Sequence, residues 1–144
     1  MNDGDPGFGS KLRCGARILV VDDHRLSRDA AKLLLEDVGY AVDCAENAEQ
    51  ALLADAASSD VILLDLQMRP TGGAAVKREL DRRGVSVPVI VVSGADDIAR
   101  VAQAIGAFAW LHKPLDFEKL TQLIEAALLA RPPSSAEPLR RARY

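Results

Sequence analysis

The sequence has few cysteines and no surplus of positive charge. Cys14 and Cys44 are its two cysteines, too few for a disulfide framework or a cysteine-rich zinc site, so we expect both to stay reduced. The formal net charge is -3, whereas binding to nucleic acid phosphates depends on clustered Lys and Arg. The charge therefore argues against direct nucleic acid binding.

Long apolar runs are also absent. No stretch approaches the roughly 18 to 20 apolar residues that cross a bilayer. The N-terminus lacks the basic region followed by an apolar region that marks a secretory signal. We therefore expect a cytoplasmic protein that does not contact a membrane.

The length and the composition of the two ends indicate one domain between two tails. Gly, Asp and Ser are frequent in residues 1–16, and Pro and Ser begin residues 132–144, so we expect both segments to be flexible. Residues 17–131 are expected to form one domain, because a chain of 144 residues has no room for a second. Three arginines in the tail are expected to be solvated rather than bound to an acidic partner: Arg140, Arg141 and Arg143.

Short apolar runs alternate with longer amphipathic segments, which is typical of a parallel sheet with crossover helices. The predicted strands are Arg17–Val21, Tyr40–Ala45, Val61–Leu64, Val87–Val92 and Phe108–Leu111. The predicted helices are one that Gly39 ends, one that starts near Ala48, one from Ala74 to Arg83, one from Asp96 to Ile105, and one after Asp116. The sequence therefore predicts an α/β fold of five strand and helix units.

Local signals refine the helices. Asn47 is the expected N-cap of the second helix, with Gln50 placed to reach back to the cap, and Asp116 is the expected N-cap of the last helix. The first helix carries an apolar stripe that we expect to face the sheet. Its members recur at helical spacing: Leu26, Ala30, Leu33, Leu34 and Val38.

Charged and polar residues stand at or just after the carboxyl ends of four predicted strands. These residues are Asp22 and Asp23 after the first strand, Asp65 after the third, Ser93 after the fourth and Lys113 after the fifth. Ligands of open α/β sheets bind beyond the carboxyl ends of the strands. Each residue alone could be a cap or a solvated loop residue, but together they predict one functional site.

Three neighbouring carboxylates repel one another unless a pKa rises or a cation binds. A divalent cation is the simpler solution. Mg²⁺ takes oxygen ligands octahedrally and keeps several waters, so one or two carboxylates and a phosphate oxygen suit it. We therefore expect Mg²⁺ at this site, with Mn²⁺ as an alternative.

The residues at these strand ends resemble those of the receiver domains of two-component response regulators, the CheY-like superfamily. The resemblance covers about residues 17–131. It rests on the motifs Val20–Asp23, Leu63–Met68, Val91–Ala95, Gly106–Ala107 and Trp110–Pro114. It implies a flavodoxin-like, doubly wound, five-stranded parallel sheet of order 2-1-3-4-5 with five helices.

The resemblance also implies the chemistry. Asp65 would be the phosphoacceptor and a metal ligand, and the other ligands would be Asp22, Asp23 and the main-chain carbonyl of Gln67. The metal and Lys113 would hold the phosphoryl oxygens while the Asp65 carboxylate attacks in line. Phosphorylation of Asp65 is therefore the expected event at this site.

Two further residues would carry the signal in such a domain. Ser93 would move to hydrogen-bond the phosphoryl group, and Trp110 would turn inward to fill the vacated space, as a population shift between two packings. The alternative for Trp110 is a fixed core or surface aromatic. The resemblance also implies a cis bond between Lys113 and Pro114, whereas Arg69 stands where such domains commonly have a proline, so the shape of that loop is not predicted.

A sensor histidine kinase or a histidine phosphotransfer protein would supply the phosphoryl group. The downstream target would be a protein that contacts the fourth helix, the fifth strand and the fifth helix. Because residues 132–144 are too short for an output domain, we expect a stand-alone response regulator. The alternatives are a phosphorelay intermediate and a receiver cut from a larger kinase or regulator.

Two other functions compete with this one. Aspartyl-phosphate hydrolases usually carry a second acid two residues after the nucleophile, where this sequence has Gln67. A pseudo-receiver that only binds a partner would not need the complete acidic set. His24 and His112 lie beside site residues, but each is expected to be a partly exposed bystander rather than a ligand or a phosphorelay histidine.

Overall fold

The computed structural model describes residues 15–54 and 56–130. The strands are β1 (Arg17–Val21), β2 (Ala41–Ala45), β3 (Val61–Asp65), β4 (Val89–Ser93) and β5 (Ala109–His112). The helices are α2 (Arg25–Val38), α3 (Ala48–Leu53), α4 (Gly73–Arg82), α5 (Ile98–Ala104) and α6 (Phe117–Ala130), with a short 3-10 helix η1 (Ala56–Ser58). Most of the predicted leader and all of the predicted tail, including Cys14 and the tail arginines, lie outside the described residues.

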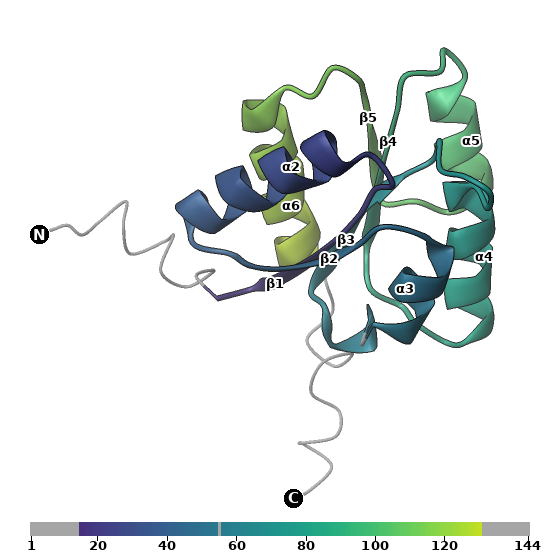
Figure 1. Cartoon of the computed structure of the whole chain (residues 1–144), viewed down its shortest axis with the longest axis horizontal. Coiled ribbons are helices and arrows are strands. Elements are labelled where there is room, and N and C mark those ends of the chain that lie inside the picture. The colour runs from purple at the N-terminus through teal and green to yellow at the C-terminus, as the bar shows by residue number, and fades with distance from the viewer. Residues whose placement is uncertain (1–14, 55, 131–144) are drawn as a thin grey trace, which may run out of the picture.

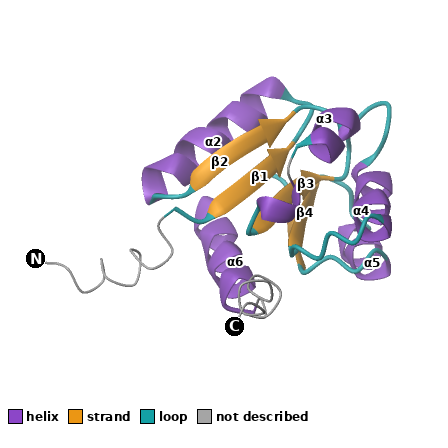
Figure 2. Cartoon of the chain, turned by 90° about the horizontal axis from the view of Figure 1, so that it is seen from below, coloured by secondary structure: helices purple, strands orange, loops and turns teal. Residues whose placement is uncertain are grey.

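All neighbouring strands pair in parallel, in the order β2-β1-β3-β4-β5. Helices α2 and α6 cover one face of the sheet, and α3, α4 and α5 cover the other (Figure 1). Figure 2, seen from below, shows the strands between these two layers. The predicted α/β fold, its strand order and its five helices are confirmed.

The core consists of two apolar layers, one on each face of the sheet. Alternate residues of β1 enter different layers: Ile18 and Val20 pack with α2 and α6, whereas Leu19 and Val21 pack with α3, α4 and α5. Strands buried on both faces read as continuous apolar runs. The sequence pattern of the strands was therefore a reliable guide to the sheet.

The predicted orientation of α2 was wrong. Leu26 and Leu33 are 74% and 69% exposed, and the residues that α2 buries in the core are Ala31 and Leu35. The guanidinium of Arg28, which is partly buried, donates to the main-chain oxygen of Asp22, 2.9 Å away. Two of the predicted stripe leucines thus face outward, whereas Leu35, which was not in the predicted stripe, is fully buried.

The predicted N-caps of two helices are confirmed. The Asn47 side chain accepts the N–H of Gln50 at 2.8 Å, and the Asp116 side chain accepts two main-chain N–H groups of α6, as predicted. The Gln50 side chain reaches back one residue beyond the cap, to the N–H of Glu46. Strand β4 begins two residues later than predicted, because Pro88 has no N–H to donate to a neighbouring strand.

No helix in the described ranges combines the length and the apolar character needed to cross a membrane.

Candidate functional site

Three carboxylates meet at the carboxyl ends of β1 and β3. Asp22, Asp23 and Asp65, here called the acidic cluster, each offer an oxygen within 4.8 Å of the others. Asp22 and Asp65 are buried, whereas Asp23 is exposed. Within the described ranges this is the one group of three or more acidic, His or Cys side chains that could hold a metal ion.

Main-chain N–H groups of the loops hold each carboxylate in place. His24 donates to Asp22 and Gln67 donates to Asp65, both at 2.8 Å, and the N–H of Arg69 donates to Asp23 at 3.1 Å. The last bond ties the loop after β3 to the end of β1. A main-chain donor thus orients each of the three carboxylates, which favours a preorganised site.

Lys113 brings the one ammonium group that bonds to the acidic cluster in the described chain. Its Nζ lies 3.0 Å from Oδ2 of Asp65, whose side chain is 4% exposed. The Lys113 N–H also donates to the main-chain oxygen of Ser93, which ties the end of β5 to the end of β4. The Lys113–Pro114 bond is cis, as predicted, and so is the Arg69–Pro70 bond, which was not predicted.

The charges of this site do not balance. Three carboxylates and one ammonium group leave two formal negative charges in excess. Burial raises the pKa of Asp22, and the negative charge of Asp65 raises this pKa further, while the N–H of His24 and the charge of Lys113 oppose the rise. The site would therefore gain from a bound cation, and an all-oxygen donor set suits a hard divalent ion such as Mg²⁺.

Ser93 and Trp110 lie on the same face of the sheet. The Ser93 side chain is buried, and its Oγ accepts the N–H of Ala95 at 3.0 Å. Trp110 is 44% exposed and pairs with Val91, two residues before Ser93 on β4. Residues two apart on a strand share a face, so Ser93 lies on the same face as Val91 and its partner Trp110. A rearrangement of Ser93 would therefore change the packing on the face where Trp110 lies.

Neither histidine is a member of the acidic cluster. His24 contributes its main-chain N–H, but its ring lies 3.3 Å from the hydroxyl of Ser27. The ring of His112 contacts the main-chain oxygen of Lys113 and lies 3.7 Å from Asp96. Both side chains therefore have partners outside the cluster.

Close packing against Asp65 requires a glycine that the sequence did not reveal. A Cβ at Gly73 would lie 2.3 Å from the main-chain oxygen of Asp65, well inside any tolerable contact. The Gly73 N–H donates to the main-chain oxygen of Leu66 at 3.1 Å. Helix α4 thus begins directly against the end of β3, and this fixes the loop that carries Gln67.

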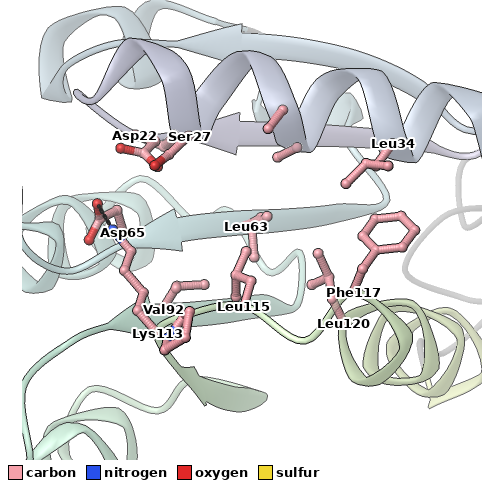
Figure 3. A pocket seen from close by; sticks show the side chains of 14 residues that line it. Asp22, Ser27, Leu34, Leu63, Asp65, Val92, Lys113, Leu115, Phe117 and Leu120 are labelled. Carbon is pink, nitrogen blue, oxygen red and sulfur yellow. Dashed lines mark hydrogen bonds and ion pairs between the residues drawn. The ribbon is translucent and has the colours of Figure 1, made fainter.

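A cavity of about 580 Å³ opens beside Asp65, between α2 and the start of α6 (Figure 3). Leu63 of β3 and Val92 of β4 contribute to its lining, and Asp22, Asp65 and Lys113 lie at one end. The α2 side is lined by Ser27, Ala30, Ala31 and Leu34, opposite Leu115, Phe117 and Leu120. The small side chains of Ser27, Ala30 and Ala31 leave this space on the α2 side, and no pattern in the sequence indicated it.

A protein-family model described as the response regulator receiver domain matches residues 18–125. The chain is 33% identical over 122 residues to the transcriptional regulatory protein TdiR of Thauera aromatica. The aligned region covers 83% of this chain and 54% of TdiR. It is also 33% identical over 115 residues to the response regulator MprA of Mycolicibacterium vanbaalenii. That aligned region covers 78% of this chain and 50% of MprA. The chain therefore spans about half the length of these curated relatives.

Among solved structures, the chain is similar to the response regulator TrrA of Thermotoga maritima in complex with Mg²⁺ and BeF. The TM-score is 0.70 and the identity 29%, over 78% of this chain and 98% of that chain. The family match, the sheet order and the acidic cluster agree with one another. This chain belongs to the response regulator receiver domain family of two-component systems.

Proposed function

We propose that this receiver domain is a phosphorylation switch in which Asp65 accepts a phosphoryl group from a histidine kinase or a histidine phosphotransfer protein. One observation carries the proposal: a buried Asp65 carboxylate lies in the acidic cluster and 3.0 Å from the Nζ of Lys113. Family membership supports it, since receiver domains are phosphoacceptor switches. A cytoplasmic location would give the domain access to such a kinase.

In the proposed reaction, an Asp65 carboxylate oxygen attacks the phosphorus of phosphohistidine. A bond between this oxygen and phosphorus forms, the nitrogen–phosphorus bond breaks, and the released imidazole takes up a proton. Lys113 stabilises the negative charge on the phosphoryl oxygens. The N–H of Gln67 orients the carboxylate during the attack.

Asp22, Asp23, Asp65 and the main-chain carbonyl of Gln67 would hold Mg²⁺, or Mn²⁺ in its place. The ion would supply neutralisation of the phosphoryl charge. The two excess negative charges of the site support this assignment, and the complex of TrrA with Mg²⁺ and BeF supports Mg²⁺ as the ion.

The proposed switch couples Ser93 to Trp110. The Ser93 hydroxyl would leave the N–H of Ala95 and donate to the phosphoryl group, and Trp110 would then turn inward. The phosphoryl group drives this shift only to the extent that it binds one arrangement better than the other.

The proposed output surface is formed by α5, β5 and α6. Phe108 and Trp110 are 40% and 44% exposed there, and a surface pocket of about 540 Å³ lies beside Trp110, Lys119 and Leu123. We propose a protein target, in keeping with the net charge of -3, rather than direct contact with nucleic acid. A phosphorelay intermediate and a receiver within a larger kinase or regulator are the alternative settings for the same domain.

A hydrolase that turns over phosphate esters is less well supported. The residue two positions after Asp65 is Gln67, whose amide cannot donate a proton as a general acid. Steady turnover of a phosphate ester that Asp65→Asn abolishes would favour the hydrolase over the switch.

Intact-mass measurement tests the proposed function. After incubation with acetyl phosphate and Mg²⁺, the wild-type chain should gain the mass of one phosphoryl group, and Asp65→Asn should not. Chelation of the metal with EDTA should slow the gain strongly. No adduct on the wild type, or an equal adduct on the variant, would contradict the proposal.

A further inference from the structure

Hydrogen bonds close a ring around Asp65. The Gln67 N–H donates to one oxygen of Asp65 at 2.8 Å, and the Gln67 side-chain oxygen accepts the N–H of Gly94 at 2.8 Å. Gly94 follows Ser93, whose main-chain oxygen accepts the N–H of Lys113 at 2.9 Å. The side-chain Nζ of Lys113 donates to the other oxygen of Asp65 at 3.0 Å, which completes the ring. Gln67 is thus the side chain that joins the loop after β3 to the loop after β4.

The two N–H groups after Ser93 are both engaged within the protein. The Gly94 N–H donates to Gln67, and the Ala95 N–H donates to the Ser93 hydroxyl at 3.0 Å. A phosphoryl group on Asp65 would add anionic acceptors beside these donors. Hydrogen bonds to charged acceptors are stronger than those between neutral groups, so the phosphoryl group would compete with the neutral amide oxygen of Gln67.

We propose that the Gln67 side chain is a latch that holds the loop after β4 in its unphosphorylated arrangement. The latch rests on the proposed function and specifies how the switch is restrained. While the Gly94 N–H is bonded to Gln67, the loop keeps the Ser93 hydroxyl turned toward Ala95. Phosphorylation releases the Gly94 N–H, and the loop then moves as a unit with Ser93.

A latch and a merely structural role predict opposite changes in the affinity for a phosphoryl mimic when Gln67 is replaced. If Gln67 only supported the fold, its loss would loosen the site and weaken binding of a phosphoryl mimic. As a latch, its loss instead removes a bond that must break on switching, so the mimic should bind more tightly. One neutral hydrogen bond corresponds to a change of roughly 2- to 10-fold.

The test is a titration with beryllofluoride at saturating Mg²⁺, followed by Trp110 fluorescence and by the amide resonance of Gly94. Gln67→Met keeps the length of the side chain and removes its strong acceptor, and Gln67→Ala provides a second variant. Gln50→Met is the matched control, because the Gln50 side-chain oxygen also accepts a main-chain N–H, that of Glu46 at 2.9 Å, away from the site.

We expect the beryllofluoride concentration at the midpoint of the titration to fall roughly 2- to 10-fold in Gln67→Met. It should stay at the wild-type value in Gln50→Met. Before beryllofluoride is added, the Gly94 amide resonance should already differ from the wild type in Gln67→Met, because its acceptor is lost, and should be unchanged in Gln50→Met. An unchanged or higher midpoint in both Gln67 variants would overturn the latch alone, provided that the wild type responds. Absence of any response in the wild type, or an equal response in Asp65→Asn, would instead overturn the proposed function and the latch with it.

Discussion

Replacement of Asp22 by Asn should have opposite effects on stability in the absence and in the presence of Mg²⁺. The substitution removes one negative charge from the acidic cluster and keeps an oxygen that can accept the N–H of His24. The oxygens of the cluster lie within 4.8 Å of one another, and at that upper limit two unit charges repel by ~0.9 kcal/mol in bulk water and by ~3.5 kcal/mol at an effective dielectric constant of about 20. The nearby charge of Lys113 offsets part of this repulsion.

We therefore expect metal-free Asp22→Asn to unfold with a free energy about 1 to 2 kcal/mol above that of the wild type. In Mg²⁺ the order should reverse. At 100 times its dissociation constant, a ligand stabilises a protein by about 2.7 kcal/mol, and the variant should lose most of this gain together with a ligand. Asp29→Asn removes the same charge from an exposed position on α2 and should change stability by no more than about 0.5 kcal/mol in either condition.

The pH dependence provides an internal check on this prediction. Because the pKa of Asp22 is raised from 3.8 in the folded state, its contribution to stability is fully present below 3.8 and is lost as the pH rises through the folded value. This loss should be absent in Asp22→Asn. Chemical denaturation with and without Mg²⁺ is the assay. A variant that is less stable than the wild type without metal, or that is stabilised equally by Mg²⁺, would refute the electrostatic reasoning.

Three further outcomes follow from the packing and the charges. Leu35→Ala should lower the free energy of unfolding by about 2 to 5 kcal/mol and Leu33→Ala by less than about 1 kcal/mol; equal losses would contradict the observed rotation of α2. Gly73→Ala should destabilise the domain by about 1 to 3 kcal/mol, whereas a gain would mean that α4 can move away from β3. The Mg²⁺ affinity measured by calorimetry should fall as the pH drops through the raised pKa of Asp22, since the proton competes with the metal; a pH-independent affinity would exclude Asp22 as a ligand.

The strands and the polar residues at their ends could be predicted from local sequence, and the strand order from the resemblance to receiver domains. Strands buried on both faces must be apolar throughout, and parallel strands bring their carboxyl ends to one edge. Asp22 and Asp65 therefore had to approach each other once β1 and β3 were identified as neighbours. Their burial and their exact partners did not follow from this argument.

Features that depend on contacts between distant segments were not predictable. The spacing of leucines in α2 fitted a buried stripe, but α2 buries Ala31 and Leu35 instead. The bond from Gly94 to Gln67 joins residues 27 positions apart, and that from Arg69 to Asp23 joins residues 46 apart. Main-chain donors leave no signal in the sequence, because every residue except proline carries one.

Chemical trapping of the phosphorylated residue tests the central claim most directly. After reaction with acetyl phosphate and Mg²⁺, borohydride reduces an aspartyl phosphate to homoserine, and peptide mass spectrometry locates the change. We predict conversion at Asp65, dependent on Mg²⁺, with Asp22 and Asp23 unmodified. Conversion at another aspartate, or none at Asp65 under conditions that saturate the metal, would contradict the account.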